Sequence, residues 1–311
     1  MSGLVYLTGT SRSGKTLLRH VLSSHPRIWL SRRTDLWTRF DGRFGDLADD
    51  GNARRCVEAI LARKQVASLR LDPDRILAEL ATGAPTYGRL FEIVLRDAAR
   101  AAGKRRGGEQ SEDLDRCAPA VLRAHPDARI VHVVRDPRDR YEAVVARDGR
   151  APGRLWRTTA QWCASAERAE RNARRHPGRY AVVRYEDLVA DPAATVRALC
   201  DFLGEDYEPA MVAVPDARRY DELRTGPGAT PISGRFVGRG GALPPREVAF
   251  IQCAARRPMR ALGYEPRPVR LGWRDRVAHA ATAPIAAIAR TPGAARDALA
   301  SGPARRREVA A

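Results

Sequence analysis

The sequence predicts an α/β fold of three layers, with helices flanking a central, mostly parallel sheet. Three short runs have the composition of buried strands, and they are Leu4–Leu7, Ala128–Val134 and Tyr180–Tyr185. Each run is followed by a segment with helical periodicity. Strands that alternate with helices are typical of a parallel sheet covered on both faces.

The composition limits the classes of partner. The 311 residues carry 55 Lys and Arg against 37 Asp and Glu, a formal net charge of +18. Only Lys15, Lys64 and Lys104 are lysines, so the excess is almost entirely arginine and reflects a bias of the whole chain. No basic segment is interleaved with aromatic residues, so we expect no nucleic-acid partner. The five cysteines are scattered, which argues against a zinc site and a disulfide framework.

Two regions differ in composition. Residues 1–265 have the pattern of one folded domain, whereas residues 266–311 form an Ala-, Arg- and Pro-rich tail, partly helical or disordered. Trp273–Ala289 has the pattern of a weak basic amphipathic helix, a candidate contact for a membrane or a partner. The first strand begins near Leu4, leaving no room for a targeting peptide, and no apolar run is long enough to span a membrane. We therefore expect a cytoplasmic protein.

The first half of the chain yields the following expectations. After the first helix, Ser23–Pro26 turns the chain into a second strand, Ile28–Leu30. The polar residues 31–37 then fall at the carboxyl end of that strand, the edge where open α/β sheets bind ligands. Helices are predicted over Asn52–Val66, Asp72–Leu80 and Tyr87–Ala102. Lys104–Glu112 is glycine-rich and charged, which predicts a mobile loop.

The second half is predicted to be mainly helical around its two strands. His132 lies within a strand, where a hydrogen-bonded core residue is expected. Helices are predicted over Tyr141–Arg147, Thr158–Arg175, Asp191–Leu203 and Pro244–Leu262.

The segment Gly9–Thr16, read GTSRSGKT, lies between the first strand and the first helix. It satisfies the pattern G-x-x-x-x-G-K-[ST] of phosphate-binding loops, so the expected architecture is a three-layer P-loop fold. The first N–H groups of a helix lack intrahelical partners and carry partial positive charge. Arg12 and Lys15 add formal charge to this anion site. The alternative is an ordinary turn that happens to contain glycines.

Four segments in order resemble the sulfotransferase family that uses 3′-phosphoadenosine 5′-phosphosulfate (PAPS). The resemblance covers roughly residues 1–265. The segments are Arg12–Leu18 (RSGKTLL), Pro126–Asp139 with its RDPRD ending, Tyr185–Pro192 (YEDLVADP) with Phe202-Leu203-Gly204, and Ser233-Gly234-Arg235 with Leu262-Gly263-Tyr264.

The resemblance implies roles at the matching positions. The loop residues Arg12, Ser13, Gly14, Lys15, Thr16 and Leu17 would bind the 5′-phosphosulfate. Arg135 would bind the 3′-phosphate, Tyr185 would lie near the adenine, and Arg235 or Arg239 would close over the 3′-phosphate.

The sequence departs from the family pattern in four places. Lys15 stands where the family usually has Thr or Ser, and Ala143 where a serine usually assists the 3′-phosphate arginine. Glu109-Gln110-Ser111 replaces a Lys-Thr/Ser-Pro segment, with Gln110 in place of a cation. Arg33 occupies the position of a glutamate base found in protein-tyrosine sulfotransferases, with Asp35 two residues on.

The predicted reaction is in-line sulfuryl transfer from PAPS to a hydroxyl or amine, without a metal. Lys15 and Arg12 would stabilise charge as adenosine 3′,5′-bisphosphate (PAP) leaves, and Asp35 is the candidate base. The acceptor could be a small metabolite, carbohydrate, lipid or peptide, and residues 30–110 and 145–160 are expected to recognise it.

Two other functions stay open. A P-loop kinase would use Lys15 on the phosphates, Thr16 on Mg²⁺ and Asp136 as a second acidic group, but it leaves the segments around Arg135 and Tyr185 unexplained. A degenerate, non-catalytic nucleotide-binding protein would explain the departures at Ala143 and Gln110.

Overall fold

The computed structural model describes residues 3–213, 232–273 and 276. The chain forms two compact units. The first comprises the residues up to Val133 together with Asn172–Ser233, and the second comprises Val134–Arg171 and the residues from Gly234 onward.

The first unit contains a five-stranded sheet in the order β2-β3-β1-β4-β5, so β1 is its middle strand. The pairs β1–β3, β1–β4 and β2–β3 are all parallel. The strands are β1 Val5–Thr8, β2 Ile28–Arg32, β3 Arg106–Gln110, β4 Arg129–Val134 and β5 Tyr180–Arg184. The loops that follow β1, β2 and β3 therefore leave the sheet at one edge.

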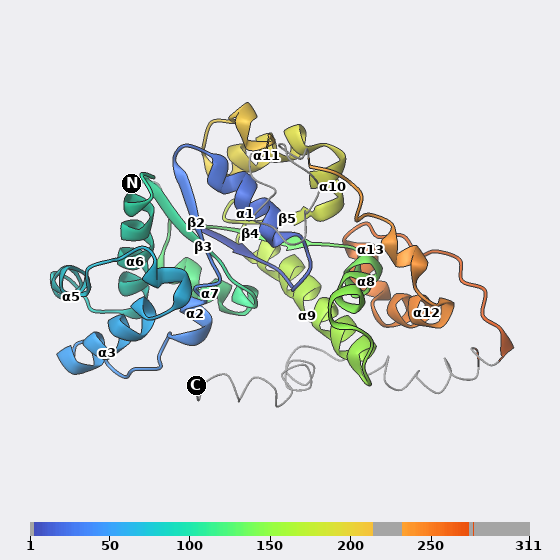
Figure 1. Cartoon of the computed structure of the whole chain (residues 1–311), viewed down its shortest axis with the longest axis horizontal. Coiled ribbons are helices and arrows are strands. Elements are labelled where there is room, and N and C mark those ends of the chain that lie inside the picture. Colours follow the sequence, from blue (N-terminus) through green and yellow to red (C-terminus); the bar gives the residue numbers. More distant parts are fainter. Residues whose placement is uncertain (1–2, 214–231, 274–275, 277–311) are drawn as a thin grey trace. The chain divides into compact units, whose positions relative to one another are not determined.

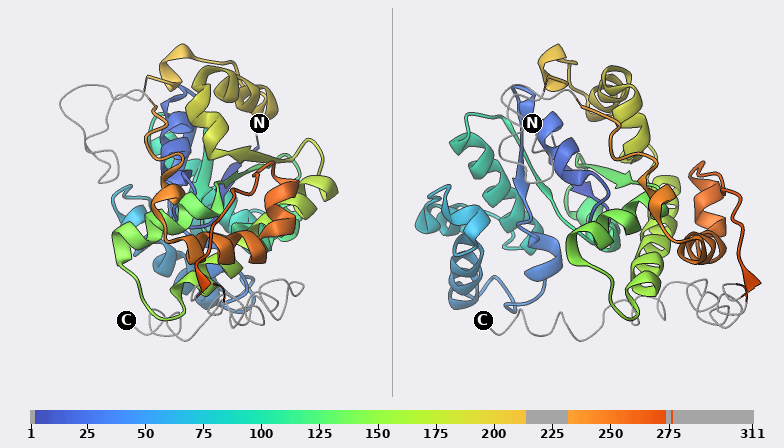
Figure 2. Two further views of the ribbon diagram at one scale, coloured as in Figure 1. Left: turned by 90° about the vertical axis from the view of Figure 1, so that its right-hand side faces the viewer. Right: turned by 45° about the vertical axis from the view of Figure 1, so that its right-hand side comes forward.

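Helices cover both faces of this sheet, as the three-layer prediction requires. Val5 and Leu7 belong to a core with residues of α1, α10 and α11, whereas Tyr6 belongs to a second core with residues of α3, α5, α6 and α7. Figure 1 and Figure 2 show these two groups of helices on the two sides of the sheet. The helices of this unit are α1 Lys15–Ser24, α2 Leu36–Arg39, α3 Asp50–Leu61, α4 Lys64–Ala67, α5 Pro73–Ala81, α6 Tyr87–Ala101, α7 Leu114–Ala124, α10 Tyr185–Ala190, α11 Pro192–Leu203 and the 3₁₀ turn η1 Pro209–Met211.

The mobile loop predicted over Lys104–Glu112 is wrong, because this segment contains β3. A Cβ at Gly107 would lie 2.2 Å from the Leu95 carbonyl oxygen, and one at Gly108 would lie 1.9 Å from that of Val5. The glycines therefore allow the strand to approach helix α6 and strand β1. Gly107 and Gly108 are thus strand residues at positions where a side chain would not fit.

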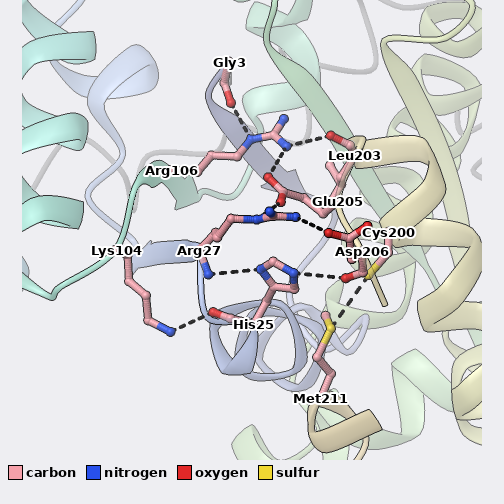
Figure 3. Close-up of polar contacts among 10 residues, drawn as sticks. All are labelled: Gly3, His25, Arg27, Lys104, Arg106, Cys200, Leu203, Glu205, Asp206 and Met211. Carbon is pink, nitrogen blue, oxygen red and sulfur yellow. Dashed lines mark hydrogen bonds and ion pairs between the residues drawn. The ribbon is translucent and has the colours of Figure 1, made fainter. Parts of the chain in front are cut away.

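A buried ion pair anchors the amino end of β3 (Figure 3). Arg106 Nη1 lies 3.1 Å from Glu205 Oε1, and both side chains are almost fully buried. Arg106 also donates to the carbonyl oxygens of Gly3 and Leu203. Arg27 Nε contacts the other oxygen of Glu205 at 2.6 Å. We call Arg106, Glu205 and Arg27 the buried clamp. It joins β3 to the chain before β1 and to the end of α11.

The second unit is helical in its described part and has its own small cores. Trp162, Met259 and Tyr264 pack together in one of them, and Tyr141 and Ile251 lie in another. Its helices are α8 Pro137–Asp148, α9 Arg154–Arg175 (whose last turn belongs to the first unit), the 3₁₀ turn η3 Arg239–Ala242, α12 Pro245–Ala254 and α13 Arg256–Ala261.

Several helix predictions need correction. The predicted helix Asn52–Val66 is two helices, α3 and α4, and Pro244–Leu262 is likewise divided into α12 and α13. Helix α8 begins at Pro137, earlier than predicted, because Asp136 caps it through a hydrogen bond from the Arg138 N–H.

The predicted amphipathic helix Trp273–Ala289 and most of the tail fall outside the described residues. None of the helices in the described ranges combines the length and the apolar composition needed to cross a bilayer.

Arg106→Met should lower the free energy of unfolding by about 3 kcal/mol or more, since it leaves Glu205 buried beside a half-exposed Arg27 alone. Urea unfolding measures this change. Arg54→Met removes the exposed pair with Asp74 and should cost ~0–1 kcal/mol. Equal losses in the two variants would contradict a dominant role for the buried clamp.

Candidate functional site

The loop after β1 is shaped by two glycines. Gly9 has φ 140°, and a Cβ there would lie 2.3 Å from the Val133 carbonyl oxygen. Gly14 has φ 98° and directly precedes α1, whose first residue is Lys15. These conformations favour glycine, so the strand-turn-helix geometry predicted from the sequence is confirmed.

The start of α1 fits an anion. No side chain caps the helix, and its first turn contains no acidic residue. Ser13 is almost fully buried, and its Oγ has no hydrogen-bond partner among the described residues. Lys15 is also buried and donates to the Thr10 carbonyl oxygen within the loop. The N–H groups of a first helical turn, the orphaned Ser13 hydroxyl and the Lys15 ammonium together make a site suited to an anion.

Two further predicted residues lie at this loop. Arg12 has φ 66°, a left-handed conformation that is uncommon outside glycine. The buried Tyr185 ring packs against the loop, since a Cβ at Gly14 would lie 2.4 Å from Tyr185 Cδ2. The structure thus brings Tyr185 to the phosphate-binding loop.

Glu112 and Asp35 occupy the loops after β3 and β2. Glu112 Oε1 lies 3.8 Å from Lys15 Nζ, and the Glu112 side chain is 24% exposed. Asp35 is more buried and accepts a hydrogen bond from Ser111 Oγ at 2.8 Å through Oδ1. Its Oδ2 lies 3.4 Å from Arg39 Nε and 3.6 Å from Arg63 Nη2. Asp35 is therefore held by three side chains, whereas Glu112 lies beside the loop lysine.

Glu109 is a fully buried carboxyl group in the same region. Its Oε2 accepts hydrogen bonds from Thr34 Oγ1 and from the Leu36 N–H, while Oε1 has no partner among the described residues. Burial raises the pKa of Glu109 to about 7, although the hydrogen bonds from Thr34 and Leu36 oppose this shift. Glu109 thus fixes the turn that presents Asp35.

The second unit holds the predicted 3′-phosphate residues. Arg135 lies at the end of β4, where its carbonyl oxygen accepts a hydrogen bond from Trp162 Nε1. Its Nη2 donates to the Phe236 carbonyl oxygen at 2.6 Å. Arg235 and Arg239 lie over the Phe236 ring, with guanidinium carbons 4.6 and 5.6 Å from the ring centroid. The three predicted arginines therefore meet around one short segment.

Asp139 holds that segment in place. Its two carboxylate oxygens accept hydrogen bonds from the N–H groups of Gly238 and Gly240, both at 2.7 Å. A Cβ at Gly240 would lie 2.6 Å from the Cβ of Arg138, so only glycine allows this approach. Arg239 also pairs with Glu142 at 2.9 Å, one residue before Ala143. The first turns of α8 thus anchor the glycine-rich segment.

Asp136, the acidic group of the kinase alternative, is engaged within the second unit. Its carboxylate receives hydrogen bonds from the Arg138 guanidinium, with Nη2 to Oδ2 at 2.6 Å. A carboxylate neutralised in this way is a poor ligand for Mg²⁺. The described residues also contain no group of three or more His, Cys, Asp or Glu side chains suited to a metal ion.

Comparison with known proteins identifies the family. The model of the sulfotransferase family matches residues 5–209. The chain belongs to the sulfotransferase family. None of the curated proteins matches it.

Two solved structures share the sulfotransferase fold. The sulfotransferase domain of the Synechococcus PCC 7002 olefin synthase has 18% identity and a TM-score of 0.53, with 90% of this chain and 94% of that chain covered. The sulfotransferase domain from the curacin biosynthetic pathway has 17% identity and a TM-score of 0.54, with 86% and 99% covered. The family supports sulfuryl transfer as the general activity, and the two structures support the fold.

Sequence reasoning singled out the loop and the arginines, but it assigned no role to three carboxylates of the same regions, Glu109, Glu112 and Asp139. Glu109 and Glu112 flank Gln110-Ser111 in the segment predicted to be a mobile loop, so they were not assigned to a sheet edge. Asp139 belonged to the RDPRD motif, yet only its position one turn into α8 shows which N–H groups it binds. An acidic residue directly after the pair Gly107-Gly108 is the signal that could have found Glu109.

Glu109→Gln should remove a pH dependence of stability. The folded-state pKa of about 7 lies above the ordinary 4.5, so the native state keeps the proton to higher pH than the unfolded chain. The stabilisation this brings is complete below pH 4.5 and is lost as pH rises to 7, by about 3 kcal/mol. Urea unfolding of both proteins from pH 4 to 8 gives the difference.

Between pH 4.5 and 7 the free energy of unfolding of the wild type should therefore fall relative to that of the variant. Above pH 7 the difference between the two proteins should stay constant. Glu79→Gln, at a carboxylate whose pKa is lowered by its hydrogen bond with Arg96, is the control and should show no such gain. A constant difference between wild type and Glu109→Gln across the range would contradict the raised pKa.

Proposed function

We propose that this protein transfers the sulfuryl group of PAPS to an alcohol or amine and releases PAP. The observation that supports this proposal is the start of α1, where an uncapped helix, the buried Ser13 hydroxyl and Lys15 form a cradle for an anion. Arg12, Gly14, Thr16 and Leu17 complete the loop that would bind the 5′-phosphosulfate.

For the 3′-phosphate we propose Arg135 with Arg235 or Arg239, because a guanidinium binds phosphate oxygens in pairs. Tyr185, packed on Gly14, would lie against the adenosine. Asp139 would act indirectly, by fixing the segment that carries these arginines.

Glu112 is the carboxylate we propose as the base. It is partly exposed and lies beside Lys15, whereas Glu109 is fully buried. Asp35 stays a prediction for this role, but its contacts with Ser111, Arg39 and Arg63 favour a positioning role.

The proposed reaction is a single displacement. The acceptor oxygen or nitrogen forms a bond to sulfur, its proton goes to Glu112, and the bond between sulfur and the bridging oxygen breaks. Lys15 and Arg12 stabilise the negative charge on the departing phosphate. No step requires a metal ion.

Titration calorimetry with PAP, AMP and ATP–Mg²⁺ tests the donor. Wild type should bind PAP more tightly than AMP, and Arg135→Ala should weaken PAP at least tenfold while changing AMP little. Arg147→Ala, an exposed arginine at the end of α8, is the control and should bind PAP as wild type does. Tighter binding of ATP–Mg²⁺ would favour the kinase, and binding of none would favour the degenerate protein.

Glu112→Gln should lower kcat about 100-fold and leave PAP affinity within twofold, because it removes proton transfer but no donor contact. Labelled PAPS and an acceptor found by screening alcohols and amines provide the assay. Glu112→Asp should recover part of the activity. Loss of the acidic limb of the pH–rate profile in Asp35→Asn, with Glu112→Gln active, would instead make Asp35 the base.

A further inference from the structure

Three arginines lie beside the carboxyl end of β2. Arg33 follows the strand, Arg39 ends α2, and Arg63 precedes α4. Arg63 Nη2 donates to the Arg33 carbonyl oxygen at 2.9 Å and lies 3.6 Å from Asp35 Oδ2, which Arg39 also contacts. We call these three residues the arginine cluster.

The three guanidinium groups of the arginine cluster share the carboxylates of Asp35 and Glu112. Partial burial lowers the pKa of Arg63, and Arg39 and Arg33 lower it further, while Asp35 and the more distant Glu109 oppose them. Arg63 Nε is buried and has no hydrogen-bond partner among the described residues. This orphaned N–H, in a group of three cations, is a donor that a further anion could use.

The arginine cluster is open to solvent at its outer side. The Arg33 and Arg39 side chains are 50% and 36% exposed. Arg33 and Asp35 both have left-handed backbone conformations, with φ 52° and 56°. Non-glycine residues keep such conformations where the surrounding structure holds them, and they concentrate at ligand sites. Here Glu109 provides the constraint, through Thr34 and Leu36.

Glu112 connects the arginine cluster to the phosphate-binding loop. Its Oε1 lies 3.8 Å from Lys15 Nζ, and its Oε2 lies 4.0 Å from Arg33 Nη2. A molecule with an oxyanion on the arginines could therefore place another of its groups beside Glu112 and the loop lysine.

We propose that the acceptor is an anionic alcohol whose carboxylate or phosphate binds to Arg33, Arg39 and Arg63. This inference rests on the proposed function and adds the chemical class of the acceptor. Planar guanidinium groups bind carboxylate and phosphate oxygens through paired hydrogen bonds, which would orient the hydroxyl toward Glu112.

The binding test uses inorganic phosphate and malonate as probes, titrated into the PAP-saturated full-length protein at constant ionic strength. Thermal unfolding should show a saturable rise in Tm with at least one probe. The tighter probe distinguishes a phosphate from a carboxylate. Arg39→Gln with Arg63→Gln should weaken that probe at least tenfold, whereas the pair Arg54→Gln and Arg55→Gln, on the exposed face of α3, should not.

No saturable shift in wild type, or equal shifts in the two double variants, would overturn the proposal. Unchanged PAP affinity and circular dichroism show that the cluster variant is folded. If PAP itself fails to bind, the proposed function fails, and the same titrations on the nucleotide-free protein still decide whether the arginines bind an anion.

The kinetic test compares acceptors that wild type sulfates. The cluster variant should raise KM at least tenfold more for anionic alcohols than for neutral alcohols, whereas any loss of Asp35 positioning should lower kcat for both kinds alike. An acceptor set that is entirely neutral, or an equal KM change for both kinds, would also overturn the proposal.

Discussion

The close approach of β3 to its neighbours is the constraint on which the rest of the first unit depends. β3 lies between β1 and β2, so its position sets the distance between the loop that follows β1 and the loop that follows β2. Gly107 and Gly108 allow this approach, and the buried Arg106–Glu205 pair fixes its beginning. Glu109 then reaches the turn after β2, and Glu112 reaches Lys15. One short strand thus aligns both sides of the carboxyl edge.

Backbone strain follows the same edge. Five non-glycine residues in the described ranges have positive φ, and four of them, Arg12, Arg33, Asp35 and Asp113, lie in the loops that follow β1, β2 and β3. Strain of this kind costs on the order of 1–3 kcal/mol per residue, so it persists where other contacts enforce it. At this edge of the sheet the backbone conformations of the loops therefore cost stability, and the surrounding contacts keep the loops in a defined geometry.

Much of the fold was predictable because its signals are local. The strands Val5–Thr8 and Arg129–Val134 are apolar, and α11 is bounded by Asp191 and Gly204. His132, predicted to be a hydrogen-bonded core residue, is buried and lies 2.7 Å from the Tyr180 hydroxyl. β3 could not be predicted from hydrophobic periodicity, because Gly107 and Gly108 stand where the neighbouring backbone leaves no room for a side chain. Its sequence therefore lacks the apolar pattern of a strand.

Of the candidate site, the contiguous loop was predictable from the sequence, whereas the contacts between separate loops were not. The loop Gly9–Thr16 is contiguous in sequence, so its motif alone predicts a phosphate-binding loop. The contacts of Asp35 with Ser111 and Arg63, and that of Glu112 with Lys15, join residues from separate loops. Such contacts depend on strand order, which a single sequence does not specify.

Asp139 has a consequence for how the second unit recognises anions. The N–H groups of Gly238 and Gly240 each donate to its carboxylate, so they are occupied by a side chain of the protein itself. A phosphate at this segment would have to rely on long arginine side chains in place of these rigid backbone donors. Of these arginines Arg135 is buried, whereas the Arg239 side chain is 43% exposed and so accessible to arginine-directed reagents such as phenylglyoxal. If the proposed 3′-phosphate site is correct, recognition there would depend on side-chain charge and not on backbone donors.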